Sequence, residues 1–201
     1  MNVSVLGCED YKTSFWSGGT TTELYLWPRD GSYAERDFLF RLSTASVEQE
    51  ESTFTHLPGI KRILMPLTGE MVLVHEGEAP RTLKPYRQDV FMGDHKTVSR
   101  GKARDFGIMT RPGCEAFLSV IELEPGIRKK IYVAPSAGVR RMEFFFPVQG
   151  GAKLGCGAGE MLLAPGMLLA AEDAEGTFTA VPEGQEALRM LWVSVRVNGR
   201  A

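Results

Sequence analysis

The sequence predicts an all-β protein built from two similar halves. Its 201 residues include 22 glycines and 11 prolines, which fall between short apolar segments. Short apolar segments bounded by turn residues are typical of antiparallel β-structure. The layout of one pair of segments, KRILMPLTGEMVL at 61–73, is repeated as MEFFFPVQGGAKL at 142–154. We therefore expect many short strands, almost no helix and an internal duplication.

The duplication indicates where the chain divides. Pro112-Gly113 is a turn pair, and the strand pattern restarts after it. We predict a first domain over residues 1–111 and a second, smaller domain over residues 112–201.

Composition excludes several classes of partner and favours the cytoplasm. The net charge is −2 and no basic stripe is present, so the sequence predicts no nucleic-acid binding. No apolar segment approaches the roughly 20 residues of a membrane helix, so we expect no membrane association. The N-terminus lacks the features of a signal peptide. The three cysteines are widely spaced and form no CxxC motif, which favours reduced thiols in a cytoplasmic protein.

Residues 54–74 are the centre of the predicted first domain. Two strand-like segments flank Thr68-Gly69-Glu70, which predicts a β-hairpin with its turn at Gly69. His75 follows the second segment beside Glu76-Gly77, and we interpret it as a turn residue.

This stretch resembles the first motif of cupins, G-x5-H-x-H-x3/4-E-x6-G, whose two histidines and glutamate hold a metal inside a jelly-roll barrel. With Gly69 as the closing glycine, Arg62 stands at the position of the glutamate. His56 then falls on the first histidine position and Pro58 on the second. The resemblance implies a double-stranded β-helix (the cupin jelly roll) that has lost its metal site, so we expect no metal and no cofactor. A guanidinium in place of a carboxylate suits an anion.

The second half matches the same motif less fully. Glu143 falls on the glutamate position, but neither histidine position carries a histidine. We therefore predict a bicupin whose second barrel lacks a polar site and acts in packing, with homodimerisation as a further role.

Residues 37–47 form the strongest single strand candidate. Alternation places Phe38, Phe40 and Leu42 on one face, and Arg41, Ser43 and Ala45 on the other. The second face is small and polar apart from the arginine. It either lines a barrel lumen, where Arg41 holds a ligand, or faces solvent.

Further candidates carry alternatives of their own. Asp105 shares a strand face with Gly107, and is either an arginine partner, a proton acceptor or part of a buried ion pair that only organises the barrel. Glu23 has the same alternatives. Trp16 either walls a pocket or plugs the barrel end, and Thr20 follows a Gly-Gly pair that either forms only a turn or approaches a ligand through its backbone N–H groups.

Five blocks appear in one order: WSGGTTTE at 16–23, RLSTASV at 41–47, FTHLPGIKR at 54–62, FMGD at 91–94 and RDFGIM at 104–109. Together they resemble the HutD/Ves family of bicupins. The resemblance implies a cytoplasmic protein linked to histidine utilisation, without an established catalytic activity, that binds a small anionic acid such as N-formylglutamate. The sequence departs from the family pattern at Gly107, where asparagine is usual.

Three hypotheses for function remain open on the sequence. The first is a non-enzymatic binder or sensor of a small anionic metabolite, which the arginines favour. The second is a metal-dependent cupin enzyme, which needs about three ligands on one face, whereas the chain has three histidines in all. The third is a metal-free isomerase, lyase or hydrolase that uses Asp105 or Glu23 with His56 for proton transfer. The ligand-binding residues predicted under the first hypothesis are Trp16, Thr20, Glu23, Arg41, Ser43, His56, Arg62 and Asp105.

Overall fold

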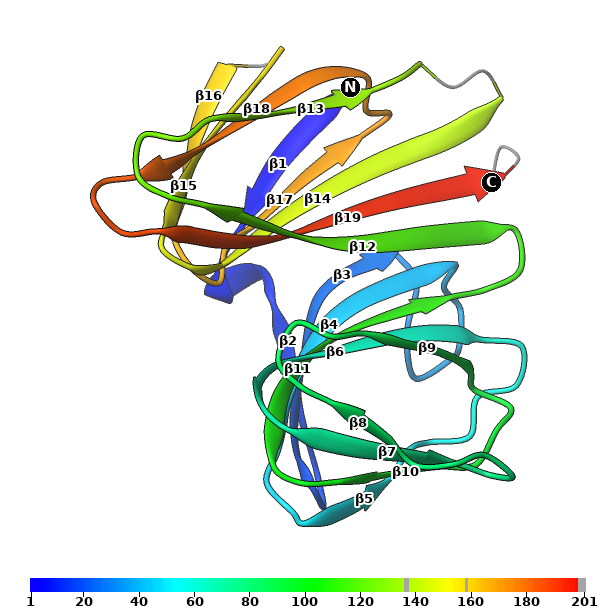
Figure 1. Cartoon of the computed structure of the whole chain (residues 1–201). Coiled ribbons are helices and arrows are strands. Elements are labelled where there is room, and N and C mark those ends of the chain that lie inside the picture. Colours follow the sequence, from blue (N-terminus) through cyan, green and yellow to red (C-terminus); the bar gives the residue numbers. More distant parts are fainter. Residues whose placement is uncertain (136–137, 158, 199–201) are drawn as a thin grey trace. The chain divides into compact units, whose positions relative to one another are not determined.

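The computed structural model confirms the all-β prediction. It describes residues 1–135, 138–157 and 159–198. Within these ranges the chain forms strands joined by turns, and helical structure is confined to one 3-10 turn at Cys8–Asp10 (Figure 1). The described ranges contain no helix with the length and apolarity needed to cross a bilayer.

The chain forms two compact units, named here the first barrel and the second barrel. The first barrel comprises Tyr11–Pro112, and the second comprises Met1–Asp10 together with the chain from Gly113 onward. The N-terminal segment therefore differs from the prediction, which placed it in the first domain. Its strand β1 (Asn2–Leu6) pairs with β17 (Leu168–Glu172) of the second barrel. Val3 and Val5 pack against the core there, which explains why the segment leaves the domain that follows it.

The first barrel consists of two antiparallel sheets. A six-stranded sheet has the order β2-β3-β4-β11-β6-β9, and a four-stranded sheet has the order β5-β10-β7-β8. The strands of the larger sheet are β2 (Lys12–Trp16), β3 (Gly19–Trp27), β4 (Phe40–Val47), β11 (Ala103–Thr110), β6 (Lys61–Gly69) and β9 (Asp89–Met92). The smaller sheet contains β5 (Glu51–Thr53), β10 (Thr97–Arg100), β7 (Met71–His75) and β8 (Arg81–Leu83).

The second barrel repeats this plan. Its five-stranded sheet has the order β1-β17-β14-β19-β12, and its four-stranded sheet has the order β13-β18-β15-β16. The strands not yet given are β12 (Cys114–Leu123), β13 (Lys129–Val133), β14 (Val139–Gln149), β15 (Gly151–Cys156), β16 (Gly159–Leu163), β18 (Gly176–Glu183) and β19 (Leu188–Asn198). In each barrel the strand that carries the cupin-like motif, β6 or β14, pairs with the last strand, β11 or β19.

The predicted hairpin at Gly69 is wrong, although the turn is present. Strand β6 belongs to the six-stranded sheet, whereas β7 belongs to the four-stranded sheet, so the two strands do not pair. The chain passes from one sheet to the other at Gly69, which has φ +77°. Gly150 has φ +68° and makes the same passage between β14 and β15. A local turn signal cannot distinguish this corner from a hairpin, because pairing depends on strands distant in sequence.

Replacement of Gly69 by alanine tests how strongly the passage of the chain between the two sheets requires a glycine. A Cβ at Gly69 would lie 2.3 Å from the carbonyl oxygen of Lys102, in addition to the cost of a positive φ. Gly77 is a matched control, because it has φ +80° and no atom within 4 Å of its Cβ position. We expect Gly77→Ala to lower the free energy of unfolding by about 1 kcal/mol, and Gly69→Ala by about 1 kcal/mol more. Equal losses in urea denaturation would show that the contact with Lys102 is unimportant.

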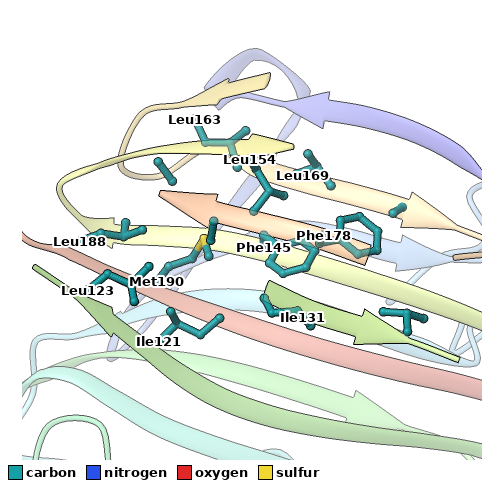
Figure 2. Close-up of a cluster of buried hydrophobic side chains, with 14 of the residues drawn as sticks. Ile121, Leu123, Ile131, Phe145, Leu154, Leu163, Leu169, Phe178, Leu188 and Met190 are labelled. Carbon is teal, nitrogen blue, oxygen red and sulfur yellow. The ribbon is translucent and has the colours of Figure 1, made fainter. Parts of the chain in front are cut away.

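The interior of the second barrel is filled by apolar side chains. Figure 2 shows residues from both of its sheets, including Phe145, Phe178 and Met190, pointing toward one another. Phe145 and Phe178 lie 5.1 Å apart between ring centroids and are fully buried. Burial of this apolar area stabilises the barrel and leaves its centre filled.

One buried polar cluster corrects the prediction that the second barrel has no polar site. Glu143 is fully buried and accepts hydrogen bonds from Arg141 Nε at 2.8 Å, Trp192 Nε1 at 2.6 Å and Ser194 Oγ at 2.9 Å. Both of its carboxylate oxygens are therefore satisfied within the protein. Such a group stabilises a specific arrangement of strands, and neither of its oxygens needs a ligand as a hydrogen-bond partner.

His75 also differs from its prediction as a turn residue. It is the last residue of β7 and is 1 % exposed. Its Nδ1 lies 2.8 Å from Thr97 Oγ1, and its Nε2 lies 2.8 Å from Asp89 Oδ2. Asp89 also accepts a hydrogen bond from Arg81 at 2.8 Å. This network joins strands β7, β8, β9 and β10 and so ties the two sheets of the first barrel together.

Candidate functional site

The first barrel contains a cavity of about 260 Å³ between its two sheets. Most of its wall comes from the six-stranded sheet, and Thr53 and Ser99 contribute from the four-stranded sheet. Ligand cavities are commonly of this order of size, with a few polar groups in a mainly apolar lining. The second barrel has an apolar centre instead.

Five of the eight predicted ligand-binding residues line the cavity: Trp16, Arg41, Ser43, Arg62 and Asp105. Alternation along the strands explains most of them. Arg41 and Ser43 lie two residues apart on β4 and share a face, as the pattern of residues 37–47 predicts, and that face is turned to the cavity rather than to solvent. Trp16 lies at the end of β2 and is partly exposed at the edge of the cavity.

The other three predicted residues do not line the cavity. Thr20 is next to Thr21, and it is Thr21 that faces inward on β3. Glu23 lies behind Arg41 as its ion-pair partner. His56 is exposed in the loop between β5 and β6, so the histidine position of the cupin motif is not part of a strand here.

Arg62 is a buried cation without a carboxylate partner among the described residues. It is 5 % exposed. Its terminal nitrogen donates to the backbone oxygen of Thr55, and its Nε has no hydrogen-bond partner. The guanidinium carbon lies 5.5 Å from the centre of the Phe54 ring and 5.9 Å from that of Phe91. Burial lowers the pKa of the Arg62 guanidinium below its ordinary value.

Arg41 is also 5 % exposed, but it is paired. Its Nε donates to Glu23 Oε2 at 2.8 Å. Its guanidinium lies 4.2 Å from the centre of the Tyr33 ring, and Arg36 lies 4.4 Å from the same ring. The terminal nitrogens of Arg41 donate no hydrogen bond to any described residue, so its outer edge remains available in the cavity.

Asp105 is the acidic group of the cavity wall. It is 5 % exposed and forms no ion pair or hydrogen bond with the described residues. Burial raises the pKa of its carboxyl to about 7. A carboxyl with this pKa is partly protonated near neutral pH and can then donate a hydrogen bond as well as accept one.

The register of the strands separates these groups along the cavity. Asp105, Gly107 and Met109 follow one another on the inward face of β11. Met109 is level with Arg41 on one side and with Arg62 on the other. The two arginines therefore belong to one end of the wall, and Asp105 lies about 13 Å further along β11 at 3.3 Å per residue. Gly107 lies midway between these ends.

Several lining residues were missed by the sequence analysis. Tyr33 lies in the segment between β3 and β4, and Phe54 follows β5. Phe91 comes from β9 and its ring packs against His75 at 4.6 Å. Phe54 and Phe91 each begin one of the family-like blocks, but a block does not show that its aromatic ring lines a cavity, and the tertiary structure brings these rings to the arginines.

The residues that hold a metal in cupins do not come together here. Within the described ranges, no group of three or more histidine, cysteine, aspartate or glutamate side chains is arranged to hold a metal ion. At the position of the cupin glutamate, the first barrel has the cation Arg62. The polar groups of the cavity lining are therefore two guanidiniums, one carboxyl and the hydroxyl groups of Tyr33 and of several serines and threonines, Ser43 among them.

The family model described as HutD matches residues 8–187. The chain belongs to the HutD family. A search of curated proteins found no match.

Solved structures extend the comparison of the fold. A conserved protein of unknown function, PA5104 from Pseudomonas aeruginosa PAO1, is 23% identical with a TM-score of 0.83, over 97% of this chain and 99% of that one. HutD from Pseudomonas fluorescens SBW25, in a formate condition, is 22% identical with a TM-score of 0.75 over the whole of both chains. Oxalate decarboxylase from Lactobacillus farciminis, in a formate complex, is 10% identical with a TM-score of 0.68, over all of this chain and 87% of that one. These likenesses show that this HutD-family chain has the cupin jelly-roll fold.

Proposed function

We propose that this HutD-family protein binds a small carboxylic acid in the cavity of its first barrel. The observation that carries the proposal is Arg62, a buried guanidinium that lines the cavity, has no carboxylate partner in the described structure and has an unpaired Nε. A buried charge without a partner is unfavourable, and a bound carboxylate would supply the missing partner. The planar guanidinium presents paired N–H groups that match a carboxylate.

Arg41 supports the same ligand class. Glu23 holds its Nε and Tyr33 lies against its plane, so the side chain is fixed with its terminal nitrogens unused. Pre-ordering of this kind lowers the entropic cost of binding. Arg41 and Arg62 are both level with Met109, one on each side, so one carboxylate group at this end of the cavity can meet both cations.

We further propose that binding serves a regulatory or sensing role in histidine utilisation, with N-formylglutamate as the leading candidate ligand. Membership of the HutD family supports the pathway, and the formate condition of the Pseudomonas fluorescens structure is in keeping with a small carboxylate. N-formylglutamate carries two carboxylates and a formamide, so it offers both anionic and neutral hydrogen-bonding groups. The three free thiols are in keeping with a cytoplasmic protein.

Titration calorimetry with purified protein tests the proposal. We expect N-formylglutamate to bind with one site per chain and to raise the melting temperature, whereas its diamide, which lacks carboxylates, should do neither. The melting temperature should rise further with each increase in ligand concentration, because binding to the folded state alone stabilises by mass action. If formate, glutarate, urocanate and N-formylglutamate all fail to bind the wild type, the proposal is wrong.

A metal-free enzyme is the second candidate, and one observation favours it. Asp105 has a pKa of about 7 and lines the cavity, as a general acid or base requires. Its predicted partner His56 is exposed and does not line the cavity, and the alternative carboxylate, Glu23, is paired with Arg41. Turnover of a bound acid that is lost in Asp105→Asn, while binding is retained, would support the enzyme over the binder.

A further inference from the structure

Gly107 occupies an unusual position for a glycine. It lies within β11, which is paired on both sides, opposite Ser43 of β4 and Leu64 of β6. Its φ is not in the left-handed region, so the backbone does not require glycine. A Cβ built there would meet only Ser43 Oγ, at 3.6 Å. Glycine weakens the interior of a strand, and it often marks a place where a ligand approaches the backbone.

The second barrel shows what a large side chain does at the same place. Leu64 is opposite Gly107 in the first barrel, and Phe145 is opposite Trp192 in the second. Leu64 precedes the corner glycine Gly69 by five residues, and Phe145 precedes Gly150 by the same interval. Gly107 and Trp192 are therefore equivalent positions of the duplicated fold.

Trp192 packs against the core of the second barrel and donates its indole N–H to Glu143. Glu143 is itself equivalent to Arg62, since each lies seven residues before its corner glycine. In the second barrel, an indole thus packs at this position and donates one of the hydrogen bonds to the buried ionic group. In the first barrel, glycine leaves that space open, and the Nε of Arg62 has no hydrogen-bond partner.

The space beside Gly107 joins the two polar ends of the cavity. The arginines are level with Met109, and Asp105 lies at the opposite end of the same inward row. Neither arginine forms an ion pair with Asp105 in the described part of the chain. A ligand that contacts both ends must pass over Gly107.

We propose that Gly107 determines the size of the ligand by providing the space for the body of an elongated carboxylic acid, whose far end carries a hydrogen-bonding group facing Asp105. This inference rests on the proposed function and specifies the ligand class further. The carboxylate lies at Arg41 and Arg62, the body lies against Gly107 and Ser43, and a carbonyl, amide or second carboxyl group reaches Asp105. Formate is too short to span these ends and occupies only the arginine end.

The experiment is titration calorimetry of the full chain with formate, glutarate and N-formylglutamate. We expect the wild type to bind the two longer acids at least tenfold more tightly than formate. Gly107→Val places a branched side chain in the space and should weaken the longer acids at least tenfold, with formate binding changed less than twofold. Gly107→Ala adds only a Cβ in ordinary contact with Ser43. It should weaken the binding of the longer acids by a smaller factor, and again more than the binding of formate.

Gly155→Val is the matched control. Gly155 lies within β15 of the second barrel, and the nearest atoms to its Cβ position belong to Thr179 at 3.9 Å. This variant should bind all three acids as the wild type does. If the wild type binds the acids, but Gly107→Val and Gly107→Ala weaken formate and the longer acids equally or not at all, the size inference is wrong while the proposed function stands. Absence of any binding to the wild type would overturn both.

Discussion

Replacement of Arg62 by methionine should lower the affinity for carboxylic acids by about 100-fold, which corresponds to about 2.8 kcal/mol. Hydrogen bonds to a charged group contribute about 1.5–3 kcal/mol each, and Arg62 has an unpaired Nε for such a bond. Arg62→Lys should lose part of this affinity, because an ammonium keeps the charge but cannot reproduce the planar fork. Calorimetry with N-formylglutamate measures both losses.

Arg62→Met should not destabilise the unliganded protein. Methionine is apolar and flexible, so it can fill the space between Phe54 and Phe91, and it removes a buried cation that has no carboxylate partner in the described structure. We expect the free energy of unfolding in urea to stay equal to that of the wild type or to rise.

Arg100→Met provides the control for a lost arginine in the same barrel. Arg100 forms an exposed ion pair with Glu51, and its removal should leave affinity and stability nearly unchanged. If Arg62→Met binds the acid as tightly as Arg100→Met does, Arg62 is not the anion site.

The arginines could be predicted from the sequence because two independent patterns located them. Alternation along residues 37–47 gave Arg41 a face shared with Ser43, and the closing glycine of the cupin-like motif placed Arg62 at the position of an inward ligand. Both patterns depend on residues close together in sequence, within one strand or one turn, where the direction of a side chain follows from its position along the strand. The all-β class and the HutD family were predictable for related reasons, since turn residues and ordered blocks are local features.

The errors have a different origin. The pairing of β6 with β11 rather than with β7 is a long-range choice, which the turn at Gly69 does not encode. His75 has a glycine turn beside it in sequence, but its burial depends on Asp89 and Thr97, which come from other strands. His56 was placed by motif spacing alone, and a loop occupies that part of the motif here.

One aromatic lining residue, Tyr33, could not be predicted for the same reason. Tyr33 comes from an irregular segment between β3 and β4, where no periodicity applies. The importance of Gly107 depends on strand register, because the comparison with Trp192 requires the pairing of β11 with β6 and of β19 with β14. On the sequence, Gly107 was simply a departure from a family pattern.

Asp105→Asn should make the unliganded protein more stable at high pH and leave its stability unchanged at low pH. Burial raises the pKa of Asp105 from 3.8 in its ordinary environment to about 7 in the fold. The folded state therefore holds the proton more tightly than the unfolded state, and wild-type stability falls as the pH rises from about 4 to about 7. Above this window the charged carboxylate costs the fold about 4 kcal/mol, at 1.36 kcal/mol for each pKa unit. Asparagine has nearly the same shape and carries no charge.

Urea denaturation of wild type and Asp105→Asn at pH 4 and pH 8.5, without added acids, measures this difference. Asp173→Asn supplies a control of opposite sign, because the hydrogen bond from Arg140 lowers the pKa of Asp173 below its ordinary value. The contribution of Asp173 is present above its unfolded pKa and is lost only as the pH falls below the ordinary value of 3.8, so that variant should be less stable than wild type at both pH 4 and pH 8.5. Asn also tolerates the φ of 50° at this position. The stability of Asp105→Asn relative to wild type should be greater at pH 8.5 than at pH 4. If it is the same at both, the Asp105 carboxyl is either exposed or paired, and its place at the far end of the cavity must be reassigned.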